Sequence, residues 1–323
     1  MSVAIIIDGN NMAHRARYAF SLSNKGEDVS VLYGFMKMLK KSMERFDPDY
    51  VVVCWDGGIP EYRRQRVPEY KANRHLDDDP LEYDSFVAQM QELDSWALPM
   101  MGVISARKQG AEADDLMWHA SRIISTEEVV IITSDKDLLQ AASDRVHIYS
   151  PTKDAIYDVD DVEDYTGVPL INYIDWRALQ GDSSDNIAGV KGIGEKTATK
   201  LFKEFDSLTG IVNMALGHYP DRDKKMSKRL KDNINEFGFK RLVDNIYVMT
   251  LYFDRVGARI AIMDAVADWR PANKIRFKKY LMSKAFVSLM DGEFYGMLMK
   301  LQQPHCFIEN MRTPIVVSKR VSA

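Results

Sequence analysis

Three apolar runs of strand length in this chain are each followed by acidic residues. The runs cover residues 3–7, 50–55 and 129–132, and they lead into Asp8, Asp56, Asp135 and Asp137. Stretches with helical spacing lie between them, and strands that alternate with helices predict a parallel α/β sheet over about the first 165 residues. Ligands bind beyond the carboxyl ends of the strands in such sheets, so we expect these acids to meet in one crevice. Each acid alone could instead cap a helix or form a turn, but their joint occurrence favours the crevice.

Two further groups of carboxylates lie later in the chain. Glu112, Asp114 and Asp115 fall in the first turn of a predicted helix, where acids suit the helix dipole but three of them repel one another unless a cation is present. Asp182 and Asp185 are three residues apart and point the same way on a helical turn, although an Asx-turn would also explain them. All-oxygen ligands without His or Cys select Mg²⁺ or Mn²⁺. Two such ions about 4 Å apart are the arrangement of nucleases that hydrolyse phosphodiesters.

The composition describes a globular chain without a membrane segment. Its 323 residues are 46% hydrophobic and 28% charged. The longest apolar run has six residues, far fewer than the roughly 20 that cross a bilayer, and the N-terminus carries no signal-type segment, so we expect neither a membrane span nor secretion. The two cysteines, Cys54 and Cys306, make neither a disulfide framework nor a zinc cluster, which fits a cytoplasmic protein. Without an obvious oligomer seam, we expect a monomer.

Basic residues are distributed unevenly, although the formal net charge of −4 argues weakly against a nucleic-acid partner. Setting the nine candidate metal ligands aside leaves 38 of the 47 acids against 43 basic residues, so the remainder is basic. Residues 189–200 have the pattern of a helix-hairpin-helix turn. In it Gly192 and Gly194 let the backbone approach a phosphate, and charge comes from Lys191, Lys196 and Lys200. A plain glycine turn is the weaker interpretation.

A second basic segment, residues 62–74, follows Asp56 and is predicted to be a loop over the crevice. Its basic residues are Arg63, Arg64, Arg66, Lys71 and Arg74. Lys71 and Arg74 are three apart, so on one helical face they could hold a scissile phosphate. A solvated charged loop is the alternative. A third basic stretch at 222–231 suits a duplex contact and a solvated helix face about equally.

These motifs, in this order, resemble the structure-specific 5′ nuclease family, which comprises flap endonucleases, the 5′ nuclease domain of bacterial DNA polymerase I and stand-alone phage 5′-3′ exonucleases. The resemblance covers roughly residues 3–255 and rests on Asp8-Gly-Asn-Asn, Trp55-Asp56, Tyr70-Lys71-Ala-Asn-Arg74, Glu112-Ala-Asp-Asp115, Thr133-Ser-Asp135-Lys-Asp137, Gly181-Asp182-Ser-Ser-Asp185 and the 189–194 turn. It implies a PIN-like catalytic domain at 1–168 with a helical arch at about 60–100, whose far side is formed by residues 81–98. A helix-hairpin-helix DNA-binding domain at 169–270 and a C-terminal extension of unknown role at 271–323 would follow.

The resemblance also implies site roles, cofactors and partners. It assigns Asp56, Glu112, Asp114, Asp115 and Asp135 to the tighter of two Mg²⁺ sites, and Asp137, Asp182 and Asp185 to the second; Asp8 acts partly through metal-bound water. Lys71 and Arg74 match residues that steer the scissile phosphate, and Arg15 matches a phosphate contact. K⁺ would bind the hairpin. The substrate would be DNA with 5′ flaps, nicks or free 5′ ends, with RNA-DNA hybrids as a variant, and a polymerase or a single-strand binding protein would be the partner.

Two other functions compete with a metal-dependent 5′ nuclease. A non-catalytic protein that binds DNA structures would use the same hairpin and basic segment, but acids that face phosphates would hinder it. A phosphatase with Asp8 as nucleophile needs a second acid two residues on, where this chain has Asn10. We therefore expect a 5′-3′ exonuclease and flap endonuclease.

Overall fold

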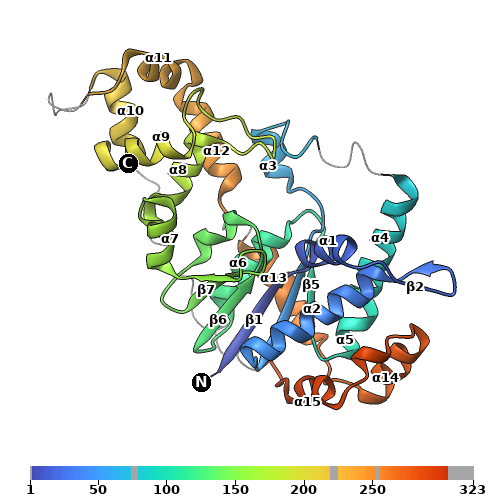
Figure 1. Ribbon diagram of the computed structural model, residues 1–323. Helices are drawn as coiled ribbons and strands as arrows, with labels where there is room; N and C mark the ends of the chain where they lie inside the picture. The colour runs from blue at the N-terminus through green and yellow to red at the C-terminus, as the bar shows by residue number, and fades with distance from the viewer. Residues whose placement is uncertain (1, 74–78, 219–224, 252–254, 305–323) are drawn as a thin grey trace.

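A six-stranded sheet forms the centre of the molecule in the computed structural model, which describes residues 2–73, 79–218, 225–251 and 255–304 (Figure 1). The strands run in the order β5-β4-β1-β6-β7-β8 and are parallel except for β8, which pairs antiparallel with β7. Their bounds are β1 Val3–Asp8, β4 Tyr50–Trp55, β5 Ile104–Arg107, β6 Glu128–Ile132, β7 Val146–Ser150 and β8 Ala155–Tyr157. The predicted strands and the α/β class are confirmed.

The register of the three central strands explains why the acids meet. In β1, Asp8 lies opposite Cys54 of β4, and Ile7 lies opposite Ile132 of β6. Asp56 and Asp135 follow those partners by two and three residues, so all these acids leave the same edge of the sheet.

Helices cover both faces of the sheet, as buried parallel strands require. On one face lie α1 Gly9–Ala19, which contributes Met12, and α2 Ser30–Phe46, which contributes Leu32 and Phe35, in one cluster with Ile5 and Val53. On the other face lie α6 Ala113–Ile123, the 3-10 helix η2 Lys136–Ala141 and α13 Arg255–Ala267. A short hairpin of β2 Ser23–Asn24 and β3 Glu27–Asp28 joins α1 to α2.

The segment after β4 differs from the predicted loop, because α3 Glu61–Arg66 is a short helix followed by turns. The chain resumes with α4 Pro80–Glu92, a π-helical turn η1 Leu93–Ala97 and α5 Leu98–Met100. Asp79 caps α4 by accepting from the backbone amides of Leu81 and Glu82. The predicted helix at 81–98 is therefore present, with a π turn inside it.

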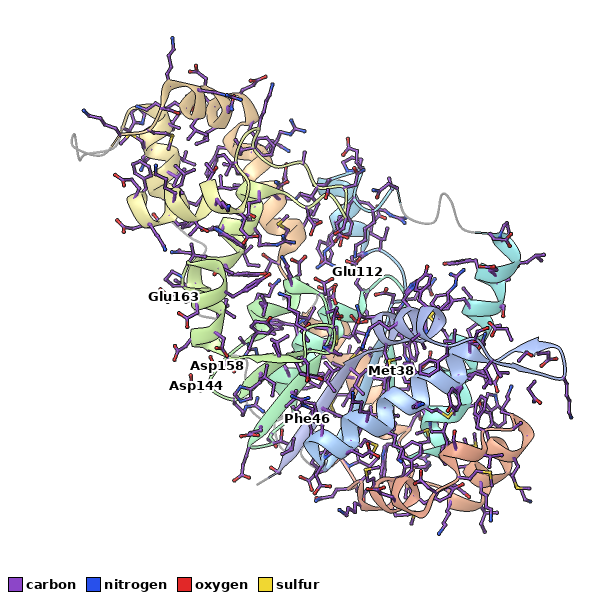
Figure 2. The ribbon with its side chains drawn as sticks, in the orientation of Figure 1. Met38, Phe46, Glu112, Asp144, Asp158 and Glu163 are labelled. Carbon is purple, nitrogen blue, oxygen red and sulfur yellow. The ribbon has the colours of Figure 1, made fainter. Side chains whose placement is uncertain are left out.

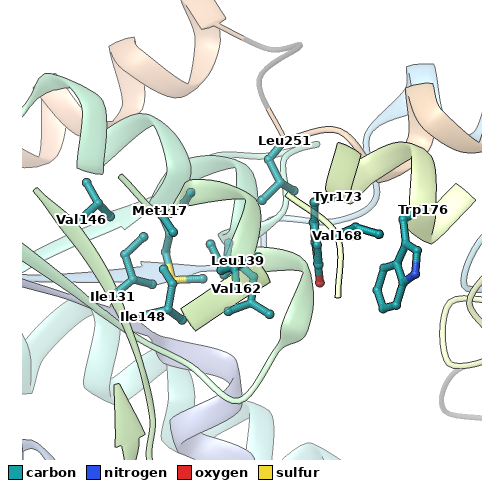
Figure 3. Packing of buried hydrophobic residues seen from close by; sticks show 14 of the residues in the cluster. Met117, Ile131, Leu139, Val146, Ile148, Val162, Val168, Tyr173, Trp176 and Leu251 are labelled. Atoms are coloured by element: carbon teal, nitrogen blue, oxygen red, sulfur yellow. The ribbon is translucent and has the colours of Figure 1, made fainter. Parts of the chain in front are cut away.

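The second half of the chain is helical, as predicted. It comprises α7 Val159–Thr166, η3 Leu170–Asn172, α8 Tyr173–Gln180, α9 Glu195–Phe205, α10 Leu208–Leu216, α11 Lys228–Phe237 and α12 Phe239–Met249. Figure 3 shows that one apolar cluster continues from Met117 and Ile131 at the sheet to Tyr173 and Trp176 of α8. The helical part is thus packed onto the core of the sheet.

The C-terminal extension, in which the sequence shows no motif, adds to the core. Its helices α14 Lys274–Ser283, η4 Val287–Leu289 and α15 Gly292–Lys300 lie on the opposite side of the sheet from α9–α11 (Figure 1). Phe277, Leu281, Phe286 and Phe294 are all at most 1% exposed and join the cluster beneath α2. Among the described helices, none has both the length and the apolar character to cross a bilayer.

Candidate active site

Asp8 and Asp56 stand at the ends of neighbouring strands and are held by hydrogen bonds. Asp8 caps α1, because its Oδ1 accepts from the Asn11 amide at 2.9 Å, and its Oδ2 accepts from the Thr133 hydroxyl at 2.9 Å. Asp56 Oδ1 accepts from the Ala113 amide at 2.8 Å. The capping interpretation of Asp8 and the crevice interpretation are therefore both correct. Thr133, a further contact, was not singled out as a site residue from the sequence.

A cavity of about 330 Å³ opens beyond these strand ends. Its acidic lining residues are Asp8, Asp56, Asp114 and Asp135, and the other walls are Lys71, Asn10, Asn11, Ala113, His14 of α1, and Tyr83, Phe86 and Met90 of α4. The crevice predicted from the sequence is present, and α4 forms one of its walls.

Burial among like charges disfavours the ionised acids of this cavity. Burial, with Asp56 and Asp135 adding to it, raises the pKa of Asp8 to about 7. Burial and the neighbouring Asp135 raise the pKa of Asp114 well above its ordinary value, and burial also raises the pKa of Asp135. A bound cation would offset this concentration of negative charge.

Arg63 lies inside the protein, which corrects its expected place on a DNA-contacting loop. Its side chain is 1% exposed and donates to Asp115 at 2.7 and 2.8 Å, and it also pairs with Glu112. Its remaining donors reach the carbonyls of Val248, at 2.8 Å, and Thr250, at 3.2 Å. Burial raises the pKa of Asp115 to about 6 despite the opposing effect of Arg63. Asp115 does not line the cavity, because its carboxylate faces Arg63.

Lys71 reaches the carboxylates from a turn rather than from a helix. Its φ is 55°, so Lys71 itself is not helical, and the expected face shared with Arg74 lies outside the described residues. The Lys71 ammonium pairs with Glu112 and lies 3.6 Å from Asp185 Oδ2. Burial alone would raise the pKa of Glu112, but Lys71 and Arg63 hold it below its ordinary value. The Tyr70 hydroxyl, 3.0 Å from Glu112 and 3.3 Å from Asp185, is a further site residue that sequence reasoning gave no role.

Arg177 of α8 holds the remaining two acids and was not identified from the sequence. It donates to Asp137 Oδ1 at 2.8 Å and also pairs with Asp182. Burial raises the pKa of Asp137 to about 7, although Arg177 opposes the rise. Asp182 Oδ1 accepts from the Ser184 amide at 2.8 Å, which is the Asx-turn considered above. The position of Arg177 five residues before Asp182 was the available signal in the sequence.

Five of the nine carboxylates, those of Glu112, Asp115, Asp137, Asp182 and Asp185, are thus paired with cationic side chains. As they stand, the described residues hold no group of three or more histidine, cysteine or acidic side chains arranged to bind an ion. Each of Arg63, Lys71 and Arg177 lies between two acids instead. The donor set still fits a hard divalent cation, because four carboxylates face one cavity.

The glycine turn before α9 has the expected shape. Gly192 has a φ of 79°, which favours glycine, and Gly194 is the N-cap of α9. Val190 and Ile193 are buried, whereas the predicted phosphate contacts Lys191, Gly192, Gly194, Lys196 and Lys200 are exposed. Among the other predicted contacts, Arg64 and Arg66 are exposed on α3 and Arg15 is partly buried on α1. Figure 2 labels Glu112 near the sheet edge that faces α3.

Comparison with known proteins identifies the family. Residues 3–167 match the 5′-3′ exonuclease N-terminal resolvase-like domain, and residues 168–250 match the 5′-3′ exonuclease C-terminal SAM fold. The chain belongs to the 5′-3′ exonuclease family. A 5′-3′ exonuclease of Bacillus subtilis is 34% identical over 224 residues, which cover 66% of this chain and 74% of that protein. The family resemblance stated from the motifs is confirmed.

Other members of the 5′-3′ exonuclease family are much longer. Thermostable DNA polymerase I of Thermus aquaticus is 37% identical over 212 residues, or 64% of this chain and 24% of the polymerase, and that of Thermus filiformis is 34% identical over 71% of this chain and 27% of the polymerase. The chain therefore spans about a quarter of the length of these relatives. Its fold is similar to that of the T5 D15 protein co-crystallized with metal ions, with a TM-score of 0.65, 20% identity and coverage of 90% of this chain and 100% of that chain.

Proposed function

We propose that this chain is a divalent-metal-dependent 5′-3′ exonuclease and structure-specific 5′ flap endonuclease that hydrolyses DNA phosphodiesters. The observation that carries the proposal is the cavity at the strand ends, which Asp8, Asp56, Asp114 and Asp135 line together with Lys71. The B. subtilis relative is a 5′-3′ exonuclease, and one similar fold is the catalytic core of Rad2 in complex with DNA substrate.

We assign the two ions to two groups of acids. The first group is Asp56, Asp114 and Asp135, with Asp8 assisting through water, and the second is Asp137, Asp182 and Asp185. Mg²⁺ is the proposed ion, with Mn²⁺ as a substitute, because the donors are carboxylates only. Glu112 and Asp115 were expected to be ligands of the first ion, but both pair with Arg63 and neither lines the cavity, which favours a supporting role for the two residues. Two such ions would supply an activated water and stabilise the leaving 3′ oxygen.

The side chains of the chain itself orient the phosphate. The Lys71 ammonium borders the cavity, where it can hold the scissile phosphate and offset the charge that develops on it. Arg74, three residues later, is proposed to share this role. The Asp8 carboxylate is fixed by Asn11 and Thr133, so it can orient a water without moving.

Duplex DNA would contact the exposed basic residues through its backbone. The amides at Gly192 and Gly194 stand at the N-terminus of α9, where a phosphate binds favourably, and Lys191, Lys196 and Lys200 add charge. Arg15, Arg64 and Arg66 are proposed as further phosphate contacts, and the turn is proposed to bind K⁺. The division into a catalytic domain at 1–168, a DNA-binding domain at 169–270 and an extension at 271–323 is kept as part of this proposal.

The decisive experiment incubates the protein with a 5′-flap duplex labelled at both ends, in Mg²⁺ and in EDTA. Mg²⁺-dependent release at or near the junction supports the proposal and gives the polarity. Tight binding without cleavage in both Mg²⁺ and Mn²⁺ would contradict it and favour a non-catalytic protein that binds DNA structures. An RNA-DNA hybrid tests the substrate variant.

Separate experiments test the proposed partners and the oligomeric state. Pull-down with a polymerase or a single-strand binding protein tests the proposed partners, and size-exclusion chromatography with light scattering tests whether the protein is a monomer. The proposed compartment is the cytoplasm of a bacterium or of an infected host, which fractionation tests.

A further inference from the structure

Three contacts fix the position of Asp56, and one of them comes from outside the crevice. The Asp56 amide donates to Asn10 Oδ1 at 3.0 Å, and its carboxylate Oδ1 accepts from the Ala113 amide at 2.8 Å. The carbonyl of Asp56 accepts from Arg107 Nη1 at 2.7 Å. The first two partners line the cavity, whereas Arg107 borders a separate surface cavity that shares none of its lining residues.

Arg107 is itself held by two groups. Its Nε donates to Asp94 Oδ2 at 2.7 Å, and its guanidinium lies 5.5 Å from the centre of the Trp55 ring. Trp55 and Arg107 are direct partners in the register of β4 and β5. The guanidinium is therefore oriented by the carboxylate of Asp94 and by the ring that immediately precedes Asp56.

Asp94 also accepts a hydrogen bond from Ser105, two residues before Arg107 on strand β5. Its Oδ1 accepts from the Ser105 hydroxyl at 2.6 Å, and Ser105 Oγ accepts from Trp55 Nε1 at 2.9 Å. Both carboxylate oxygens of Asp94 are thus used to hold the edge of the sheet beside Asp56. The Asp94 side chain is 19% exposed, and that of Arg107 is 37% exposed.

The place of Asp94 in its helix gives this arrangement a second consequence. Asp94 lies in the π-helical turn η1, directly after α4. Single π turns are rare and occur frequently at functional sites. The helix α4 itself lines the cavity through Tyr83, Phe86 and Met90. One continuous helical segment therefore contacts the acidic cavity and the support of Asp56.

We propose that Arg107 and Asp94 are positioning residues for the metal-binding carboxylate of Asp56, and that they link the helical segment at 80–100 to the metal site. The inference rests on the proposed function, since it requires Asp56 to bind a divalent ion. Neither residue touches the reacting atoms. Groups that orient a metal ligand typically change metal affinity or activity by about 10–100-fold when they are removed.

A direct contact of Arg107 with DNA is the competing explanation, because its side chain is partly exposed. The two explanations predict opposite results for Asp94→Ala. If Arg107 positions Asp56, removal of Asp94 weakens ion binding and leaves DNA affinity unchanged. If Arg107 contacts a phosphate, removal of a nearby acid strengthens DNA binding and leaves ion binding unchanged.

The test measures binding of Mn²⁺ alone, by electron paramagnetic resonance titration without DNA, for the wild-type protein, Arg107→Ala, Asp94→Ala and the double variant. We expect each single variant to raise the Mn²⁺ dissociation constant about 10-fold or more, and the double variant to be no worse than the single ones, because the two residues act as a unit. Arg107→Lys, which keeps one donor, should restore part of the affinity. Arg276→Ala, at an exposed arginine of α14, is the matched control and should bind Mn²⁺ as the wild type does.

Two activity readouts complete the test. At subsaturating Mg²⁺, kcat for a 5′-flap duplex should fall about 10-fold in Arg107→Ala and recover at high Mg²⁺, whereas the DNA dissociation constant in EDTA should stay within about two-fold. Unchanged Mn²⁺ binding in both single variants would overturn the inference while leaving the proposed function intact. A wild-type protein that binds no Mn²⁺ would overturn both, and thermal unfolding of each variant shows whether it is folded.

Discussion

Arg63 donates hydrogen bonds to both oxygens of Asp115, at 2.7 and 2.8 Å, where neither side chain is more than 1% exposed. The same guanidinium reaches Glu112 and the carbonyl of Val248 near the end of α12. One buried cation thus joins α3, the start of α6 and the helical half of the chain. Glu112 and Asp115, which by sequence look like metal ligands, are thus held by a cation that does not line the cavity.

Arg63→Met should destabilise the protein strongly. The substitution leaves Asp115 buried without its partner, and breaking a buried pair in this way costs about 3–5 kcal/mol. We expect a marked decrease in Tm and in the urea concentration at the unfolding midpoint. Arg64→Met, at the exposed next residue of the same helix, should change the free energy of unfolding by less than about 0.5 kcal/mol. Equal stability of the two variants would contradict a structural role for Arg63.

Asp135→Asn should lose cleavage while keeping DNA binding. The Asp135 side chain caps η2 through Oδ1, and an asparagine oxygen can accept the same bond, so the fold should be retained. The charge that faces the cavity is lost, and we expect at least about a 100-fold decrease in kcat, more than for a residue that only supports a ligand. Asp144→Asn, in a turn before β7, is the control. Turnover unchanged from the wild type would remove Asp135 from the metal site.

Lys71→Ala should reduce the rate far more than the affinity for DNA. Its ammonium is buried at the cavity between Glu112 and Asp185, so it can act on the phosphate there but adds little to binding along the duplex. We expect kcat to fall at least about 100-fold and the dissociation constant of a flap duplex to change less than about three-fold. Lys196→Ala, at the exposed hairpin, should show the reverse pattern. Equal losses of rate and affinity in Lys71→Ala would make it a docking residue.

The acidic half of the site could be predicted from the sequence, and its basic half only in part. Asp8, Asp56 and Asp135 follow strands whose parallel register places their ends at one edge, so sequence pattern alone brings them together. The partners of the acids depend on tertiary packing. Arg63 looks like one of several basic residues in a polar segment, and only the packing of α3 against α12 shows that it is buried. Arg177 lies on the amphipathic helix α8, and the sequence pattern does not show that it pairs with Asp137 and Asp182.

Where the C-terminal helices pack could not be predicted from the sequence, for a related reason. Phe277 and Leu281 are four residues apart, as are Phe294 and Leu298, which is a helical spacing, but the surface that they cover is formed by α2 and the segment at 80–100, far away in the chain. Local pattern predicts a helix and not its partner. A segment without a motif can therefore be part of the hydrophobic core.

Phe294→Ala should accordingly destabilise the catalytic core itself. Phe294 is fully buried and packs edge-on against the Phe277 ring, with 5.8 Å between ring centres. Truncation of a buried phenylalanine costs about 3–5 kcal/mol, and we expect unfolding by urea at correspondingly lower concentration. Val287→Ala, at a residue of η4 that is 75% exposed, should change the stability by less than about 0.5 kcal/mol. An unaffected Tm in Phe294→Ala would mean that the extension is not part of the cooperative unit.

Asp175→Asn should stabilise the protein at neutral pH and have no effect on stability in acid. Burial in α8 raises the pKa of Asp175 from 3.8 to about 6, so between these values the native state keeps a proton that the unfolded state releases. The stability that this group contributes is present below pH 3.8 and is lost as the pH rises through 6. Because the side chain is only partly shielded from water, we expect Asp175→Asn to raise the free energy of unfolding by roughly 1–2 kcal/mol at pH 7.

Urea unfolding of the wild type and of Asp175→Asn between pH 4 and pH 8 measures this difference in stability, which should grow with pH. Asp164→Asn, on the exposed face of α7, should give an offset that does not change with pH, and a constant offset for Asp175→Asn would contradict the burial of its charge.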